Sequence, residues 1–320
     1  MSLSYVSPIL RADSLVDPFG RKVKSLRLSV TQRCDLSCPH CHREGQIPST
    51  NEMTVEEIEK TLEIASSLGI RKVKITGGEP LLREDIVEIV CRISPLVDEV
   101  SLTTNGSRLA ELAGPLKASG LGRVNVSLHT LNSERYARLC GRDLIGLVLG
   151  GIRKSVSAGL NPVKVNMVVL KGENEDEIRS MMDFCADIGA TLQLIEYETD
   201  RDGLNGAEFA EKYYPLKDLE YALAKEAIEM KTNELHRRRR YKMMSGKGLV
   251  TVEVVRPMHN TEFCSHCTRL RLSSDGRLKP CLLDRSGEVD ILTPMRRGVS
   301  DDELGDLFTK AVANRKPYWR

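Results

Sequence analysis

Short apolar runs alternate with longer segments of helical periodicity between Leu26 and Tyr197 of this 320-residue chain. The runs are rich in Val, Ile and Leu, which is typical of strands that are covered on both faces. Strands that alternate with helices pair in parallel, so the pattern predicts an α/β fold, either a doubly wound sheet or an incomplete barrel. The predicted strands are Leu26–Val30, Lys72–Thr76, Glu99–Thr103, Arg123–Leu128, Val163–Leu170 and Leu192–Glu196.

The segments between the predicted strands carry helix signals. Val55–Leu68 follows Thr54, which forms a capping-box pattern with Glu57, and it ends at Gly69. Both architectures bind ligands at the C-terminal ends of their parallel strands, so polar residues that directly follow a strand are the candidate site residues. The other predicted helices are Glu84–Ile93, Arg108–Ser119, Ile145–Ala158 and Glu175–Ile188.

The alternation changes after residue 200. A helix is predicted near Leu216–Met230, followed by two strands at about Leu235–Met244 and Leu249–Val255 and by a polar helix at Asp301–Ala313. We therefore expect two parts, a core domain of residues 1–215 and a C-terminal extension of residues 216–320 that packs on it.

The charge balance argues against a general nucleic-acid or membrane binder. The chain has 47 Lys and Arg residues and 45 Asp and Glu residues, so its net charge is close to zero. Aromatic residues make up 4% of the chain, too few for base stacking. The basic run His236–Arg240 is expected to be a solvated face. No apolar run approaches the ~20 residues of a membrane span, and the first residues lack the apolar core of a signal peptide. The sequence predicts a cytoplasmic protein with no nucleic-acid partner and no membrane partner.

Nine cysteines are a high number for the cytoplasm, where disulfides are rare. Cys91 and Cys185 lie in apolar helical patterns, where a cysteine behaves as a small buried hydrophobic residue, and Cys140 is also expected to be structural. The other six form two close groups, Cys34, Cys38, Cys41 and Cys264, Cys267, Cys281.

The first cysteine group follows the first predicted strand with the spacing C-x₃-C-x₂-C. Three thiolates can hold three irons of a [4Fe–4S] cluster, which normally has four cysteine ligands, and leave one iron open for a small molecule. The alternative is a structural zinc site, which favours four ligands and would need His40 or His42 to complete it. The spacing favours the cluster.

Polar and glycine residues follow the next predicted strands. Gly77–Pro80 (Gly-Gly-Glu-Pro) comes after the second strand, and its bare backbone is suited to close approach by a ligand. Thr103 and Ser127 add polar groups after the third and fourth strands. Their joint position at successive strand ends predicts one site at this edge of the sheet.

The second cysteine group precedes a predicted hairpin. Asp275-Gly276, between two alternating runs, predicts a two-residue turn, which would place Cys281 roughly opposite Leu270 and near the other two cysteines. The group again supplies three thiolates, so a second cluster is one interpretation. A zinc ribbon completed by His266 is the other.

The same hairpin carries Arg269 and Arg271 two residues apart, which puts both side chains on one face of the strand. Two guanidinium groups beside a ligand-binding iron favour recognition of an anion, phosphate especially. The alternative is a pair of solvated arginines on the outer face of the hairpin.

The C-x₃-C-x₂-C loop and the Gly-Gly-Glu-Pro turn resemble those of the radical S-adenosylmethionine (SAM) superfamily, whose members have a partial (β/α)6 TIM-type barrel. The resemblance implies that Cys34, Cys38 and Cys41 bind a [4Fe–4S] cluster whose open iron chelates SAM. One electron then cleaves SAM to a 5′-deoxyadenosyl radical. The residues that it places at SAM are His40, Gly78, Ser127 and Glu198.

The whole-chain pattern is similar to the GTP 3′,8-cyclases of molybdenum-cofactor biosynthesis, most specifically in the motif Cys-x-x-Cys-Thr-Arg-x-Arg-Leu. The resemblance implies a C-terminal extension in which Cys264, Cys267 and Cys281 hold a second [4Fe–4S] cluster that binds the guanine of GTP. It implies hydrogen abstraction from C3′ of the ribose and ring closure onto C8, giving 3′,8-cyclo-7,8-dihydro-GTP. The implied substrate contacts are Arg27, Lys74, Thr103, Lys164, Arg269 and Arg271.

The resemblance also implies an electron donor and a downstream cyclic pyranopterin monophosphate synthase as partners, and a homodimer is left open. Gln193 stands where the best-known members have an arginine, and Glu198 stands where they have a methionine near SAM. Those members end in a Gly-Gly tail, whereas this sequence ends Tyr318-Trp319-Arg320. The alternatives are a radical SAM enzyme that acts on a peptide or another nucleotide, and a two-site zinc protein that binds a partner or RNA.

Overall fold

A partial barrel of parallel strands forms the centre of the computed structural model, which describes residues 15–199, 203–258 and 260–317. Strands β1 to β6 pair in parallel in the order in which they occur in the chain. A doubly wound sheet would reverse its order midway, so this order decides for the barrel. The strands lie close to their predicted ranges: β1 Ser25–Ser29, β2 Lys72–Thr76, β3 Glu99–Thr104, β4 Arg123–Ser127, β5 Val163–Val169 and β6 Thr191–Glu196.

The C-terminal part extends the same sheet at both edges. Strand β9 (Gly248–Val255) pairs in parallel with β6, and β10 (Arg269–Leu272) pairs in parallel with β1. The twelve-stranded sheet therefore has the order β12-β11-β10-β1-β2-β3-β4-β5-β6-β9-β8-β7, with its outermost strands unpaired to each other within the described residues. The remaining strands are β7 Glu229–Thr232, β8 Arg239–Ser245, β11 Arg277–Lys279 and β12 Val289–Asp290.

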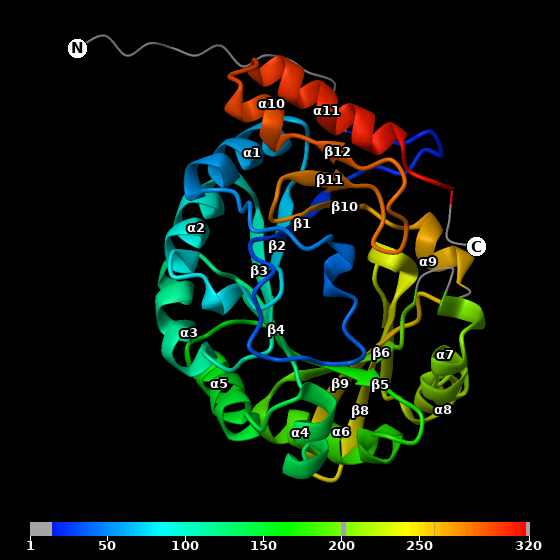
Figure 1. Ribbon diagram of the computed structural model, residues 1–320. Helices are drawn as coiled ribbons and strands as arrows, with labels where there is room; N and C mark the ends of the chain where they lie inside the picture. Colours follow the sequence, from blue (N-terminus) through cyan, green and yellow to red (C-terminus); the bar gives the residue numbers. More distant parts are fainter. Residues whose placement is uncertain (1–14, 200–202, 259, 318–320) are drawn as a thin grey trace.

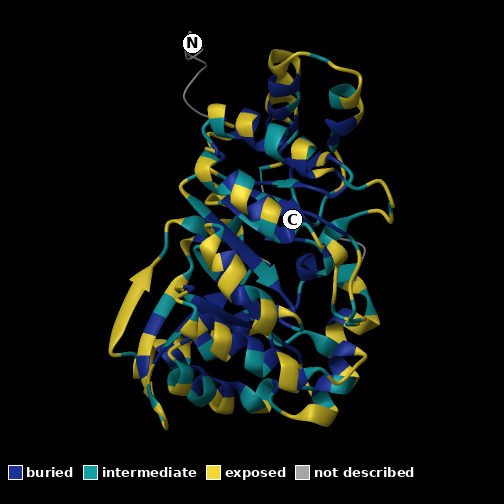
Figure 2. Ribbon diagram, turned by 90° about the vertical axis from the view of Figure 1, so that its left-hand side faces the viewer, coloured by how far each residue is buried: buried dark blue, intermediate teal, exposed yellow. Residues whose placement is uncertain are grey.

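Helices cover the outside of the strands (Figure 1), and the buried residues lie between the two layers (Figure 2). The capping box at Thr54 is confirmed, because its hydroxyl accepts from the Glu57 amide at 3.2 Å and the Glu57 carboxylate accepts from the Thr54 amide at 2.8 Å. The α-helices are α1 Val55–Ser67, α2 Ile86–Ile93, α3 Leu109–Ala118, α4 Ser133–Cys140, α5 Ile145–Ser157, α6 Ile178–Ile188, α7 Ala207–Lys212, α8 Leu216–Glu226, α9 Thr261–Ser265, α10 Leu292–Arg296 and α11 Asp301–Ala313.

Short 3-10 helices lie in the connections, at η1 Arg43–Gly45, η2 Pro80–Leu82, η3 Ser94–Leu96, η4 Glu175–Glu177, η5 Gly203–Asn205 and η6 Leu235–Arg237. Within the described ranges, no helix has both the length and the apolar character needed to cross a membrane.

Two predictions for the C-terminal part are wrong in detail. The helix predicted at Leu216–Met230 ends at Glu226, and the exposed edge strand β7 follows it. The strand predicted from Leu235 begins later, because residues 235–237 form η6 before β8 starts at Arg239. The helix at Asp301–Ala313 has the predicted bounds.

The hairpin turn is also different from the prediction. Ser273 pairs with Arg277 through a 2.9 Å backbone hydrogen bond, and Gly276 has a φ of +75°, so the loop has three residues and a left-handed glycine. Because of the extra loop residue, Lys279 pairs with Arg271, and this register places Cys281 opposite Arg269 and not opposite Leu270.

Cys91 is exposed, contrary to the prediction of a buried side chain. It lies on α2, whose buried face consists of Ile86, Ile89, Val90 and Ile93, and its position in the helix turns it to the solvent. Cys140 and Cys185 are buried as expected.

Candidate active site

Two cavities adjoin each other in the barrel. The first runs along its inside, from the first residues of β1 to β4 (Ser25, Lys72, Glu99 and Arg123) to the loops at the C-terminal ends of the strands. The first has a volume of about 320 Å³ and the second of about 150 Å³. The two cavities share five wall residues, Arg27, His42, Glu198, Val255 and Arg269, so they adjoin each other. Cys34, Cys38 and Cys41 line the first cavity, and Cys264, Cys267 and Cys281 line the second.

The loop that carries the first cysteine group is tied to the end of β3. Asp35 accepts from the Asn105 side-chain amide at 2.6 Å and from the Ser107 hydroxyl at 2.8 Å. The Ser37 amide donates to the Cys140 carbonyl at 3.0 Å, which fixes the loop on α4 as well. Burial raises the pKa of the Cys34 thiol to about 11, so the thiol keeps its proton at neutral pH unless a bound metal displaces that proton.

The two glycines after β2 are required because the backbone of residues 31–33 leaves no room for a Cβ atom at either position. A Cβ atom on Gly78 would lie 2.3 Å from the Arg33 carbonyl oxygen, and one on Gly77 would lie 2.5 Å from the Thr31 carbonyl oxygen. The Gly78 amide donates to the Thr31 carbonyl at 2.8 Å. The glycines thus let the end of β2 approach the backbone just before Cys34.

Glu79, in the same turn, connects the ends of two strands. It is fully buried, and it accepts from the Leu81 amide at 2.9 Å, the Thr104 hydroxyl at 2.6 Å and the Asn105 amide at 2.6 Å. Burial raises its pKa to about 7 although these donors favour the ionised form. Its position makes it a structural residue of the site.

The expected SAM residues lie around the first cavity. His40, Gly78 and Ser127 line it, and Glu198 lies where the first and second cavities meet. The His40 ring packs edge-on against His129, with 4.5 Å between the ring centroids. The sequence patterns had not indicated His129, which follows β4.

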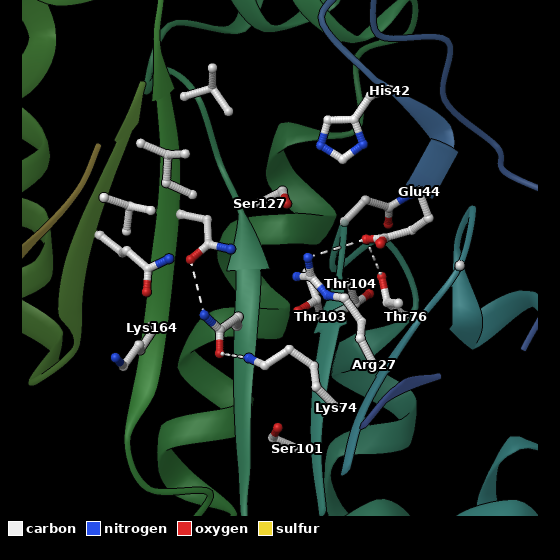
Figure 3. Close-up of a pocket in the computed structure, with 18 of the residues that line it drawn as sticks. Arg27, His42, Glu44, Lys74, Thr76, Ser101, Thr103, Thr104, Ser127 and Lys164 are labelled. Atoms are coloured by element: carbon white, nitrogen blue, oxygen red, sulfur yellow. Dashed lines mark hydrogen bonds and ion pairs between the residues drawn. The ribbon is translucent and has the colours of Figure 1, made fainter. Parts of the chain in front are cut away.

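The floor of the first cavity is polar and linked across strands (Figure 3). Lys74 donates to the Asn125 side chain at 2.9 Å, and Asn125 donates to Asn166 at 3.1 Å. Burial lowers the pKa of Lys74 well below its ordinary value, and the neighbouring cations lower it further. Thr103 lies beside these residues on β3.

Glu44 holds two of the expected substrate arginines. Arg271 donates to its carboxylate at 2.6 Å, and the Arg27 guanidinium lies 3.6 Å from its other oxygen. Burial alone would raise the pKa of Glu44, but the two arginines outweigh this effect and lower the pKa to about 2. Arg269 lies on the same face of β10 as Arg271 and lines both cavities, as the spacing predicts.

The prediction that His236–Arg240 forms a solvated face is wrong for two of its members. His236 is buried against the Phe263 ring, and Arg238 lines the first cavity with 12% of its side chain exposed. Arg238 pairs with Glu253, which also pairs with Lys164. Because Glu253 lies fifteen residues away in the sequence, the local pattern does not show this burial.

Arginines anchor the loop of the second cysteine group by its backbone. Arg21 donates to the Cys264 carbonyl at 3.0 Å, and Arg315 donates to the Cys267 carbonyl at 2.7 Å. His266 is exposed, its Nδ1 lies 3.0 Å from the Glu262 carbonyl oxygen, and it lines a different surface pocket. The histidine that the alternative zinc interpretation requires is therefore not directed at the second cavity.

Several buried polar atoms in the walls fit a ligand in the first cavity. Arg27 Nε, His40 Nδ1, Thr103 Oγ1 and Arg238 Nε have no hydrogen-bond partner in the described protein. Such an atom costs about 1–3 kcal/mol unless a partner is supplied. Among the described residues, no three His, Cys, Asp or Glu side chains are arranged to hold a single metal ion. A cluster spreads its ligands over several irons, and each cysteine group supplies three thiols to one cavity.

Two protein-family models match adjoining parts of the chain. The radical SAM superfamily model matches residues 28–185, and a model described as Molybdenum Cofactor Synthesis C matches residues 190–320. The domain boundary near residue 215 stays a prediction.

Curated relatives match over nearly the whole chain. A probable GTP 3′,8-cyclase of Thermococcus kodakarensis is 53% identical over 96% of this chain and 100% of that protein. Proteins described in the same words are 51% identical in Pyrococcus abyssi, over 95% of this chain and 99% of that protein, and 45% identical in Methanothermobacter marburgensis, over 95% and 98%.

Solved structures share the fold. SuiB of Streptococcus suis bound to S-adenosylmethionine has a TM-score of 0.62 at 18% identity, covering 85% of this chain and 64% of that chain. SuiB bound to the precursor peptide SuiA has a TM-score of 0.62 at 20% identity, covering 88% and 69%. This likeness confirms the partial barrel and extends to the fold alone.

Proposed function

Because the chain belongs to the GTP 3′,8-cyclase family of the radical SAM superfamily, we propose that it converts GTP to (8S)-3′,8-cyclo-7,8-dihydroguanosine 5′-triphosphate. This reaction is the first step of molybdenum-cofactor biosynthesis. The observation that carries the proposal is the pair of adjoining cavities, each lined by three cysteines and both lined by Arg27 and Arg269.

Family membership brings a [4Fe–4S] cluster and SAM, for which Cys34, Cys38 and Cys41 are the ligands that we propose. Bound there, the cluster supplies the electron that turns SAM into a source of a primary carbon radical. The Gly78 carbonyl would accept from the ammonium group of SAM, since the Gly78 amide is engaged with Thr31. The proposed remaining SAM contacts are His40, Ser127 and Glu198.

We assign a second [4Fe–4S] cluster to Cys264, Cys267 and Cys281, with the guanine of GTP beside it in the second cavity. The triphosphate would then lie on the cationic wall that joins the two cavities. Charge-assisted hydrogen bonds to phosphate hold the nucleotide in one orientation, and that orientation decides which ribose C–H faces the first cavity. The proposed contacts are Arg27, Lys74, Thr103, Lys164, Arg269 and Arg271.

Other substrates in the same reaction class are a peptide or a different nucleotide. Buried cations favour a compact polyanion over a peptide, because each buried charge requires a partner of opposite sign. The chemistry also requires an electron donor and a consumer of the product, for which cyclic pyranopterin monophosphate synthase is the proposed partner. We place the protein in the cytoplasm.

Anaerobic incubation with GTP, SAM and a reductant tests the proposal directly. The wild-type protein is expected to form the 3′,8-cyclised nucleotide together with 5′-deoxyadenosine. Cys34→Ala should abolish cleavage of SAM, whereas Cys281→Ala should retain some cleavage and form no cyclised nucleotide. Normal turnover of GTP by Cys281→Ala would show that the second cysteine group has no role in the reaction.

A further inference from the structure

Arg238 lines the first cavity and is not among the substrate contacts proposed above. Arg238 immediately precedes β8 in a run of four arginines, and 12% of its side chain is exposed. Its neighbour Arg237 is 48% exposed and lines a separate surface pocket. The fold therefore directs Arg238 inward, to the cavity that Lys164 and Arg269 also line.

The charge of Arg238 is partly balanced by the protein. Its guanidinium lies 3.0 Å from Glu253 Oε1, and Lys164 pairs with the other oxygen of the same carboxylate. Glu253 has no exposed surface, and Asn233 donates to it at 3.3 Å. One carboxylate thus serves two buried cations, which leaves an excess positive charge at this point of the cavity wall. A buried excess charge is costly unless a ligand of opposite sign accompanies it.

Arg238 also retains capacity to donate hydrogen bonds. A guanidinium has five N–H donors in a fixed plane, and the ion pair with Glu253 involves Nη1. The Nε atom is buried and has no hydrogen-bond partner in the described protein. An unsatisfied buried donor in a cavity wall is suited to an acceptor that a bound molecule brings.

The position of Arg238 matters because the barrel is incomplete. Arg238 lies on the side of the barrel opening where β9 and β8 follow β6, whereas Arg27 and Arg269 lie on the other side, on β1 and β10. Burial is the main cause of the lowered pKa values of Arg27 and Arg269, and like-charge repulsion by Arg238 lowers both pKa values further. An anion between them would contact both edges of the open barrel and relieve this repulsion.

On the basis of the proposed use of GTP, we propose that Arg238 is a further substrate-binding residue that donates to a phosphate oxygen of the triphosphate. Lys164, which shares the Glu253 carboxylate with Arg238, would contact the same chain of phosphates with its own ammonium group. A triphosphate carries several negative charges and many acceptor oxygens, so it satisfies both the excess charge and the open donor.

Arg238→Gln tests the proposal, with Arg237→Gln as the matched control from the same run. The dissociation constants of GTP and inorganic tripolyphosphate are measured on the reconstituted protein, together with SAM affinity and iron content. Arg238→Gln should weaken GTP and tripolyphosphate by about tenfold or more and leave SAM affinity and iron content unchanged. Arg237→Gln should change GTP affinity by less than about twofold.

The outcomes separate this proposal from the proposed function. If Arg238→Gln lowers the melting temperature but binds GTP like the wild type, Arg238 merely neutralises Glu253 and the proposal is wrong. If the wild type shows no preference for GTP over other nucleotides, the proposed function fails. A tenfold loss of tripolyphosphate binding in Arg238→Gln would still support the phosphate contact in that case.

Discussion

At the scale of single residues, burial without a full set of partners sets the electrostatics of the site. Glu253 shows the effect of added partners: burial alone would raise its pKa, but Arg238 and Lys164 lower it to about 2. Glu196, with one carboxylate oxygen lacking a partner, has a pKa raised to about 7 by burial. Glu196 lines the first cavity, and Glu253 pairs with Lys164 in its wall. A charged ligand in this cavity would therefore shift the pKa values of both carboxylates.

His129 offers a test of this electrostatic description. Burial lowers its pKa to about 4, and its Nδ1 accepts from the Val168 amide at 3.1 Å. The unfolded chain takes up a proton below the ordinary value of about 6.5, whereas the folded protein does not until about pH 4. As the pH is lowered from about 6.5 to about 4, the free energy of unfolding should therefore decrease, by up to about 1.4 kcal/mol per pH unit from this group.

His129→Asn lacks this titration, so the wild type should lose stability faster than the variant as the pH falls from about 7 to about 5. Denaturant titrations of both proteins at several pH values measure the difference. Parallel pH profiles for the two proteins would mean that His129 has the same pKa in the folded protein as in the unfolded chain.

At the scale of elements, the turn of the β10–β11 hairpin, which lies between Cys267 and Cys281, requires a glycine. Gly276 has a φ of +75°, and a Cβ atom there would lie 2.4 Å from Leu292 Cβ. Gly298 has a φ of +76° but no atom within 4 Å of such a Cβ. An alanine at Gly298 would suffer backbone strain alone, whereas an alanine at Gly276 would suffer the same strain and a steric overlap as well.

Gly298→Ala should cost about 1 kcal/mol of unfolding free energy, the cost of a left-handed residue. Gly276→Ala should cost about 1–3 kcal/mol more, because α10 must shift to admit the methyl group. Chemical denaturation of both variants checks the difference. Equal losses would show that the hairpin and α10 are not packed as described.

The elements that the sequence predicts well are those with strong local patterns. The six barrel strands and the helix Asp301–Ala313 carry their apolar residues at regular intervals, and their bounds agree within about two residues. Strand β7 was missed because all four of its residues are exposed at the sheet edge. The Asp275-Gly276 signal fits both two- and three-residue loops, and the structure has the longer one.

The candidate site follows the same division. The sequence places the first cysteine group and the Gly-Gly turn directly after strands and the arginine pair on one face of a hairpin strand, and the structure has them there. The inward position of Arg238 depends on its distant partner Glu253, so no local pattern predicts it. Gln193, which stands where the best-known members have an arginine, lines the first cavity. The chain end Tyr318-Trp319-Arg320, which stands in place of their Gly-Gly tail, lies outside the described ranges.

At the scale of the whole molecule, both ends of the described chain meet at the second cysteine group. Asp17 is buried and pairs with Arg21 at 2.6 Å and with Arg315 at 3.0 Å. These two arginines donate to the carbonyl groups of Cys264 and Cys267. One carboxylate thus connects the N-terminal segment, the cysteine loop and the segment after α11.

Asp17→Asn should therefore weaken the cluster site proposed at the second cysteine group and spare the site proposed at the first. Removing one partner of a buried ion pair costs about 3–5 kcal/mol, since two buried arginines lose their counter-charge. Iron content should fall from about eight toward about four per chain, as each cluster holds four irons. Asp183→Asn on α6, whose carboxylate accepts from the Gly246 amide in the distant β8–β9 turn at 2.7 Å, is the control. Full iron content in Asp17→Asn would contradict this role of the network.

The central claim is that GTP lies across the two adjoining cavities with its ribose between the cysteine groups. In the proposed arrangement the cationic wall and the second cavity would fix the two ends of the nucleotide, so that one ribose C–H would face the proposed SAM site. Anaerobic turnover of GTP deuterated at C3′ measures this arrangement most directly. The 5′-deoxyadenosine formed should carry deuterium from this substrate and none from GTP deuterated at the other ribose carbons. Deuterium transfer from a different ribose carbon would contradict the claim.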